Sequence, residues 1–78
     1  MAFPNRLREL RLDRAKMAPA AFTLGALASR LGIDQSTLWR WERGVQQPTR
    51  RHVRALAREF AVAEEDLGLP TSPSDGER

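Results

Sequence analysis

The chain has 78 residues, the size of one small domain. It contains no cysteine, so disulfide bonds, thiolate metal sites and thiol nucleophiles are excluded. No apolar run approaches the roughly 18–20 residues that a membrane-spanning helix needs, and the first ten residues lack the apolar centre of a secretory signal. We therefore expect a soluble, cytoplasmic protein with no membrane partner.

The basic residues are concentrated in the first four-fifths of the chain. Residues 1–63 contain 12 of the 13 Lys and Arg residues but only 5 of the 10 acidic residues. Twelve of the 13 bases are arginine, which suits phosphate recognition better than lysine does. This distribution favours a polyanionic partner. The alternative is a solvated surface in a protein that is simply rich in arginine.

The apolar pattern predicts helices and gives no strand signal. The first predicted helix runs from about Asn5, as its N-cap, to Arg14, with Leu7 and Leu10 on its apolar side. Proline 19 should interrupt any continuation. Residues 15–21 could therefore either extend this helix or form a loop.

Two short helices should follow in close succession. Thr23 is expected to cap a helix over residues 24–31, and Gly32 to end it in the left-handed conformation. Asp34 then follows as the N-cap of a helix over residues 35–43. Only one residue separates the glycine from this second cap, so the turn between the helices should be tight.

The rest of the chain predicts one longer helix and a short turn. The third helix should end at Gly44, and Thr49 should cap a fourth helix over residues 50–60. The acids at 64–66 predict a last helical turn, because negative charge is stabilised near a helix N-terminus.

The domain organisation follows from the same pattern. Residues 1–69 are expected to form one domain. The polar, proline-containing residues 70–78 are expected to form a disordered acidic tail.

Two short helices joined by residues 32–34, the second with a polar outer face, predict a helix-turn-helix. We projected the third helix at 100° per residue. Its polar face carries Gln35, Ser36, Trp39, Arg40 and Arg43, and its apolar face carries Leu38 and Trp41. The projection predicts that Trp41 lies in the core and Trp39 on the surface.

The polar face has the chemistry to read base edges. Glutamine can bond adenine with two hydrogen bonds, arginine can bond guanine in the same way, and serine is permissive. Residues near the N-terminus of a recognition helix reach deepest into the major groove, which nominates Gln35 and Ser36, with Arg40 one turn on. Trp39 could contact a thymine methyl group, pack on the sugar-phosphate wall, or anchor another protein. Each polar residue could instead be an ordinary solvated side chain.

Residues 5–67 resemble the Cro/repressor-type helix-turn-helix family, also called the XRE family. The residues that carry the resemblance are NRLREL, FTLGALASRLGIDQSTLWRWERG and QQPTRRHVRALAREFAVAEEDL. The resemblance implies an all-α fold: a compact, four- to five-helix, lambda-repressor-like DNA-binding domain with its helix-turn-helix at the second and third helices.

The resemblance also implies roles for individual residues. Positions matching Gln35, Ser36 and Arg40 usually contact bases. Positions that usually contact phosphates match Thr23, Arg43, Gln47 and Thr49. Arg50 and Arg51, near the start of the fourth helix, are expected to flank the DNA. Arg11 and Glu42 match a pair that typically forms a partly buried salt bridge between the first and third helices.

The sequence departs from the family pattern in three places. Leu24 stands where the family very often has a glutamine that binds phosphate. The connection between the first two helices is longer than usual, and as a loop it could bring Arg14 and Lys16 to phosphate. Ala63 replaces the usual polar cap of the last helix, the end at which many relatives dimerise.

We therefore expect a small bacterial or phage transcriptional regulator, a repressor, that binds double-stranded DNA sequence-specifically as a homodimer at the nucleoid. The alternative is an antitoxin-like or anti-repressor-like module whose main partner is a protein; Leu24, the surface Trp39 and the acidic tail support it. An enzyme is not expected, because the sequence has no carboxylate pair, nucleophile–base pair or glycine-rich phosphate loop. We also expect no cofactor, no small-molecule ligand and no metal site at the solitary His52.

Overall fold

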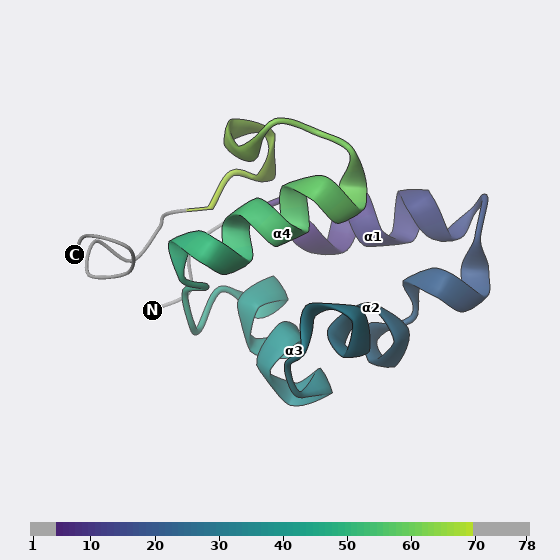
Figure 1. Ribbon diagram of the computed structural model, residues 1–78, viewed down its shortest axis with the longest axis horizontal. Coiled ribbons are helices and arrows are strands. Elements are labelled where there is room, and N and C mark those ends of the chain that lie inside the picture. Colours follow the sequence, from purple (N-terminus) through teal and green to yellow (C-terminus); the bar gives the residue numbers. More distant parts are fainter. Residues whose placement is uncertain (1–4, 70–78) are drawn as a thin grey trace.

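The computed structural model describes residues 5–69, and every regular element in that range is a helix. The α-helices are α1 (Leu7–Ala15), α2 (Leu24–Leu31), α3 (Gln35–Arg43) and α4 (Arg50–Phe60), and the short 3₁₀ helices are η1 (Pro19–Phe22) and η2 (Glu64–Leu67). Figure 1 shows α1 and α4 in one half of the molecule and α2 and α3 in the other. The predicted all-α fold is confirmed. The predicted acidic tail, residues 70–78, lies outside the described residues.

All four α-helices and η2 contribute to one core. Its buried side chains are Leu7, Leu10, Leu27, Ala28, Leu38, Trp41, Val53, Leu56, Ala57, Phe60 and Leu67. In α1, α3 and α4 these positions recur every three or four residues, and in α2 the adjacent Leu27 and Ala28 are flanked by the partly buried Leu24 and Leu31, so one stripe of each helix faces inward. Leu67 carries η2 back onto the core, and the backbone N–H of Arg6 donates to the Leu67 carbonyl at 3.0 Å. The two ends of the described chain therefore meet.

The predicted boundaries of α2 are confirmed together with both of its caps. The Thr23 hydroxyl accepts a hydrogen bond from the Ala26 N–H at 3.0 Å. Gly32 has a φ of 73°, and the Ile33 N–H then reaches the Ala28 carbonyl at 3.0 Å. This left-handed closure satisfies a carbonyl that would otherwise have no partner at the helix end.

The bounds of α3 are also as predicted, but its cap differs in one respect. Asp34 has the extended backbone of an N-cap, yet its carboxylate accepts no hydrogen bond from the first turn of α3. Its contribution is therefore its negative charge at the positive end of the helix. Gly44, with a φ of 76°, closes the other end of α3 as expected.

The predicted N-cap of the first helix is wrong by one residue, because α1 begins at Leu7 with Arg6 at its N-cap position. Asn5 lies outside α1, and its side-chain oxygen accepts from the Leu7 N–H at 3.0 Å. This is the local turn that asparagine side chains make with the backbone two residues on. The Asn5 amide group also donates to the Trp41 carbonyl at 3.0 Å, which ties the start of α1 to α3.

The segment between α1 and α2 follows neither of the two predicted alternatives in full. The helix stops at Ala15, and Pro19 begins the 3₁₀ helix η1. Arg14 donates through Nε and Nη2 to the Phe60 carbonyl, at 3.1 and 2.6 Å. Charge-assisted bonds to an otherwise orphan carbonyl at the end of α4 hold this guanidinium in place. Arg14 is thus a link between helices rather than a free phosphate contact. Lys16 is exposed, and its Nζ lies 3.9 Å from Oδ1 of Asp13.

Helix α4 ends on a residue that the sequence does not mark. Ala61 adopts the left-handed conformation with a φ of 58°, and the Val62 N–H closes onto the Ala57 carbonyl at 3.0 Å. Glycine is the usual residue here, because a Cβ disfavours positive φ. The closure is nevertheless required, since it turns the chain so that η2 returns to α4.

Replacing Ala61 by glycine should stabilise the domain. The gain should be about 0.5–1 kcal/mol, because relief of left-handed strain exceeds the added chain entropy of glycine. Urea unfolding followed by circular dichroism measures it. Ala55→Gly is the matched control, because Ala55 lies inside α4, where glycine is less favourable than alanine, so this variant should lose stability instead. A loss of stability in Ala61→Gly would contradict the assignment of strain to this turn.

Candidate nucleic-acid interface

Helix α3 has one face in the core and one face on the surface. The exposed fractions of Leu38 and Trp41 are 0% and 2%, whereas that of Trp39 is 46%. Residues two apart in a helix point in different directions, so the two indoles are separated by the helix itself. The predicted division of the tryptophans is confirmed: Trp41 is core and Trp39 is surface.

The exposed face of α3 carries all four predicted base-contacting residues. Gln35, Ser36 and Arg40 are exposed, and Trp39 stands between the two ends of this face. The Arg43 guanidinium lies over the Trp39 ring, with its central carbon 4.9 Å from the ring centroid. This cation–π contact holds a large planar group and a positive charge together at the surface.

A hollow lies beside this face, where α1, the start of α2 and α3 meet. It is lined by Arg8, Arg11, Leu24, Trp39, Glu42 and Arg43. Leu24, the departure from the family pattern, is half-buried and packs against the core. Arg8 was missed by the sequence analysis. The available signal was its i, i+3 spacing from Arg11, which places both residues on one side of α1.

Arg11 and Glu42, which the sequence analysis paired, form a two-pronged ion pair between α1 and α3. Nε of Arg11 lies 2.6 Å from Oε2 of Glu42, and Nη2 lies 3.2 Å from Oε1. Their side chains are only 12% and 4% exposed. The remaining prong, Nη1, donates to the Phe22 carbonyl at 3.2 Å. The pair therefore fixes the last turn of α3 against both α1 and η1.

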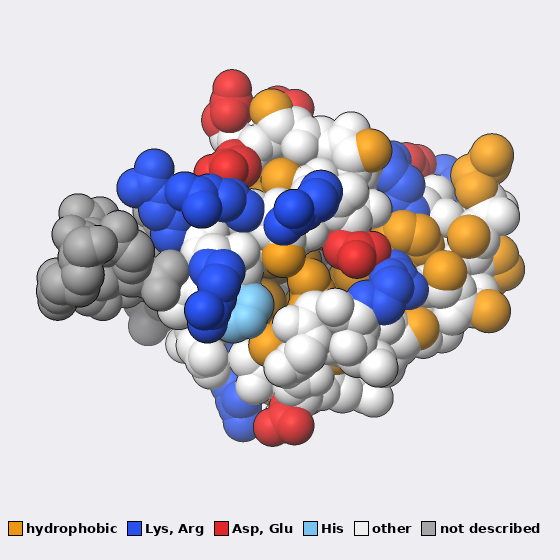
Figure 2. All heavy atoms as spheres, viewed as in Figure 1, with side chains coloured by type: hydrophobic (Ala, Val, Ile, Leu, Met, Phe, Trp, Pro, Cys, Tyr) orange, Lys and Arg blue, Asp and Glu red, His pale blue; other side chains and the backbone are white. Residues whose placement is uncertain are grey.

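Apart from Arg43, which lies in the last turn of α3, the predicted phosphate-contacting residues lie at helix starts on either side of α3. Thr23 begins α2, and the other members precede or open α4: Gln47, Thr49, Arg50 and Arg51. In the view of Figure 1, α4 begins to one side of α3 and α2 to the other. Figure 2 shows Lys and Arg side chains gathered over α4 beside the histidine. Helix starts present backbone N–H groups and positive dipole ends, so this placement suits anions.

The histidine has a structural environment. The His52 ring lies 5.2 Å from the Trp41 ring, centroid to centroid, and its Nδ1 is 3.0 Å from the Thr49 hydroxyl. The same hydroxyl caps α4 by accepting from the His52 N–H at 3.4 Å. His52 thus packs the start of α4 against the buried side of α3.

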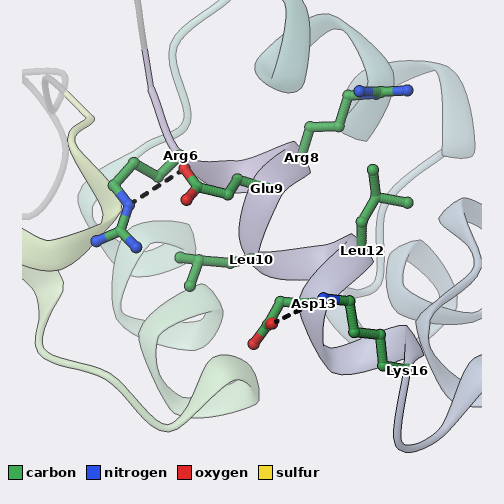
Figure 3. A pocket seen from close by; sticks show the side chains of 7 residues that line it. All are labelled: Arg6, Arg8, Glu9, Leu10, Leu12, Asp13 and Lys16. Carbon is green, nitrogen blue, oxygen red and sulfur yellow. Dashed lines mark ion pairs between the residues drawn. The ribbon is translucent and has the colours of Figure 1, made fainter.

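A second hollow runs along α1 and has a different character. Figure 3 shows ion pairs of Arg6 with Glu9 and of Lys16 with Asp13, while Arg8 points away from both. The pairs span 3.5 and 3.9 Å between exposed groups, the kind of contact that adds little stability. This surface is a solvated helix face.

Two further classes of site are not seen among residues 5–69. No group of three or more His, Cys, Asp or Glu side chains in this range could hold a metal ion. No helix of the described chain is long and apolar enough to cross a membrane.

The family comparison agrees with this geometry. The model of the helix-turn-helix domain family matches residues 3–68, so the chain belongs to that family. This membership agrees with the resemblance to the Cro/repressor type and with a lambda-repressor-like fold, and it supports DNA as a partner. Neither a curated protein nor a solved structure matches the chain.

Breaking the buried ion pair should destabilise the domain strongly. Glu42→Gln leaves the Arg11 guanidinium buried without a counter-charge, which should cost roughly 3–5 kcal/mol of unfolding free energy. Glu59→Gln is the control, because its pair with Arg30 is 28% and 35% exposed. Glu59→Gln should therefore lower the free energy of unfolding by less than about 1 kcal/mol. Urea unfolding measures both variants. Equal losses of unfolding free energy would mean that the buried pair stabilises the domain no more than the exposed pair does.

Proposed function

We propose that this protein is a transcriptional regulator, a repressor, that binds double-stranded DNA sequence-specifically and reads the major groove with α3. It acts without catalysis or cofactor, in the cytoplasm of a bacterium or of a phage-infected cell. The observation that carries the proposal is the two-faced α3. Leu38 and Trp41 hold it to the core, and its free face presents Gln35, Ser36 and Arg40.

The contacts proposed for this face differ in kind. Gln35 and Arg40 have the donor and acceptor geometry to read adenine and guanine edges. Trp39, braced by Arg43, supplies a flat apolar surface for a thymine methyl group or a deoxyribose. The helix starts at Thr23 and Thr49 bind phosphates and so set the depth and register of α3 in the major groove. They carry no base preference themselves.

Two copies are proposed to bind one operator. A helix-turn-helix dimer reads two half-sites whose centres are about 34 Å, or a multiple of it, apart. Regulation would then depend on the concentration of the protein, competition for the site or a protein partner.

Selection from a random duplex library tests the proposal directly. Enrichment of a pseudo-palindromic site would support it, and the spacing between the half-sites would report the geometry of the dimer. Recovery of no common sequence, with equal affinity for all duplexes at physiological salt, would leave only non-specific binding.

Arg40→Ala should reduce discrimination at a single base position. Loss of a bidentate contact to guanine should cost roughly 1–3 kcal/mol against the selected base while leaving the other positions unchanged. Competition binding with single-base variants of the selected duplex measures this. Unchanged selectivity at every position would remove Arg40 from the base-contacting set.

Arg43→Ala should instead weaken binding to all duplexes alike. One lost phosphate contact should reduce the slope of log K against log salt by about 0.9. Arg58→Ala is the control, because Arg58 is also exposed but lies in the last turn of α4. An unaltered slope in Arg43→Ala would exclude Arg43 from the phosphate set.

The rival function, a protein-interaction module of the antitoxin or anti-repressor kind, makes a different prediction for the same surface. Chemical-shift mapping with the selected duplex distinguishes the two. Shifts centred on α3 and the helix starts support DNA recognition. Shifts confined to α4 and the residues after it would favour the protein partner.

A further inference from the structure

Gly25 is a glycine inside a helix with no conformational reason to be one. It is the second residue of α2, and the glycines with positive φ are Gly32, Gly44 and Gly68. Glycine weakens a helix relative to alanine, because it has more chain entropy to lose on folding. In an eight-residue helix otherwise rich in alanine and leucine, this cost calls for another explanation.

The explanation lies in what a side chain at Gly25 would meet. A Cβ built there would lie 3.1 Å from Oε1 of Gln35 and 4.0 Å from its Cδ, and no other atom outside α2 comes that close. The first distance is shorter than an ordinary carbon–oxygen contact. The amide of Gln35 therefore lies beside α2 at Gly25, so close that a Cβ at position 25 would crowd it.

We propose that Gly25 is a positioning residue that sets the amide of Gln35, and through it the base that α3 reads at its N-terminal end. The inference rests on the proposed function, because it assigns Gln35 to a base. A glutamine recognises adenine only when its oxygen and its NH₂ group meet the base edge together. Because Oε1 of Gln35 lies close to α2, the amide can meet the edge of an adenine only in a restricted position.

Leu24, the residue before Gly25, offers no polar group to the amide of Gln35, so the support from α2 comes mainly from its backbone at Gly25. Leu24 has no hydrogen-bonding group in its side chain. It packs against the core and lines the hollow beside Trp39. It therefore cannot brace the glutamine amide by a hydrogen bond. The flat surface at Gly25 restricts Gln35 sterically, and alanine there would push the amide outward by a few tenths of an ångström.

The first arm of the test uses the free protein. In Gly25→Ala, the side-chain NH₂ signals of Gln35 in a ¹H–¹⁵N spectrum should move, and the thermal midpoint should not fall, because alanine favours the helix. Ser29→Ala is the matched control: it is exposed in the same helix and should leave those signals unchanged. Unmoved Gln35 signals in Gly25→Ala would overturn the proposal whatever the protein binds.

The second arm uses the selected duplex and its single-base variants. Gly25→Ala should lower discrimination at the base read by Gln35 by about three- to tenfold, part of the roughly 5- to 150-fold that full loss of a bidentate contact costs. Gln35→Ala should lose that preference entirely, and adding Gly25→Ala to it should change nothing further. If the double variant bound the selected duplex more weakly than Gln35→Ala alone, Gly25 would act by another route, and the proposal would be overturned.

The two arms separate the failure of this inference from that of the proposed function. If Gln35→Ala leaves every base preference intact while Arg40→Ala does not, DNA reading by α3 stands and the role of Gly25 fails. If no variant of α3 alters selectivity, the proposed function itself fails.

Discussion

The burial of Leu38 and Trp41 is the contact on which the rest of this molecule depends. These two side chains hold the inner face of α3 to a core shared by α1, α2 and α4, and the helical repeat then turns the opposite face outward. Every other feature of the interface is set relative to this contact. Asn5 donates to the Trp41 carbonyl, and His52 packs on the Trp41 ring, so the start of α1 and the start of α4 are both anchored to the same residue.

A core of this size is supplemented by polar contacts that join distant segments. Arg14 binds the Phe60 carbonyl, Arg6 binds the Asp66 carbonyl at 3.2 Å, and Arg30 binds the Ala21 carbonyl at 2.6 Å. Carbonyls at the ends of short helices lack partners, and a long arginine side chain can reach them from another element. These contacts also change the meaning of the charge distribution. Part of the arginine excess therefore supports the fold, while Arg40 and Arg43 lie exposed on α3.

The elements that local chemistry controls could be predicted from the sequence. Caps at Thr23 and Thr49 and left-handed turns at Gly32 and Gly44 need only the residue and its neighbours, so the bounds of α2, α3 and α4 agree with the structure. The left-handed closure that follows α4 could not be predicted in the same way, although the predicted end at Phe60 agrees with the structure. Ala61 has no preference for positive φ, and its conformation follows from the need to bring η2 and Leu67 back onto the core. The path of residues 15–21 likewise depends on where Arg14 and Arg11 find their carbonyl partners.

By itself, the sequence determined that the chain is helical, that a helix-turn-helix lies at residues 24–43, and which face of its second helix is polar. The reason is that caps, glycine turns and apolar periodicity act over a few residues. Only the tertiary structure decided what surrounds that face: the Arg43–Trp39 stack, the hollow that includes Arg8, and the place of the Gln35 amide where a Cβ at Gly25 would crowd it. These depend on how α1, α2 and α3 approach one another, and a helical projection of a single element carries no information about its neighbours.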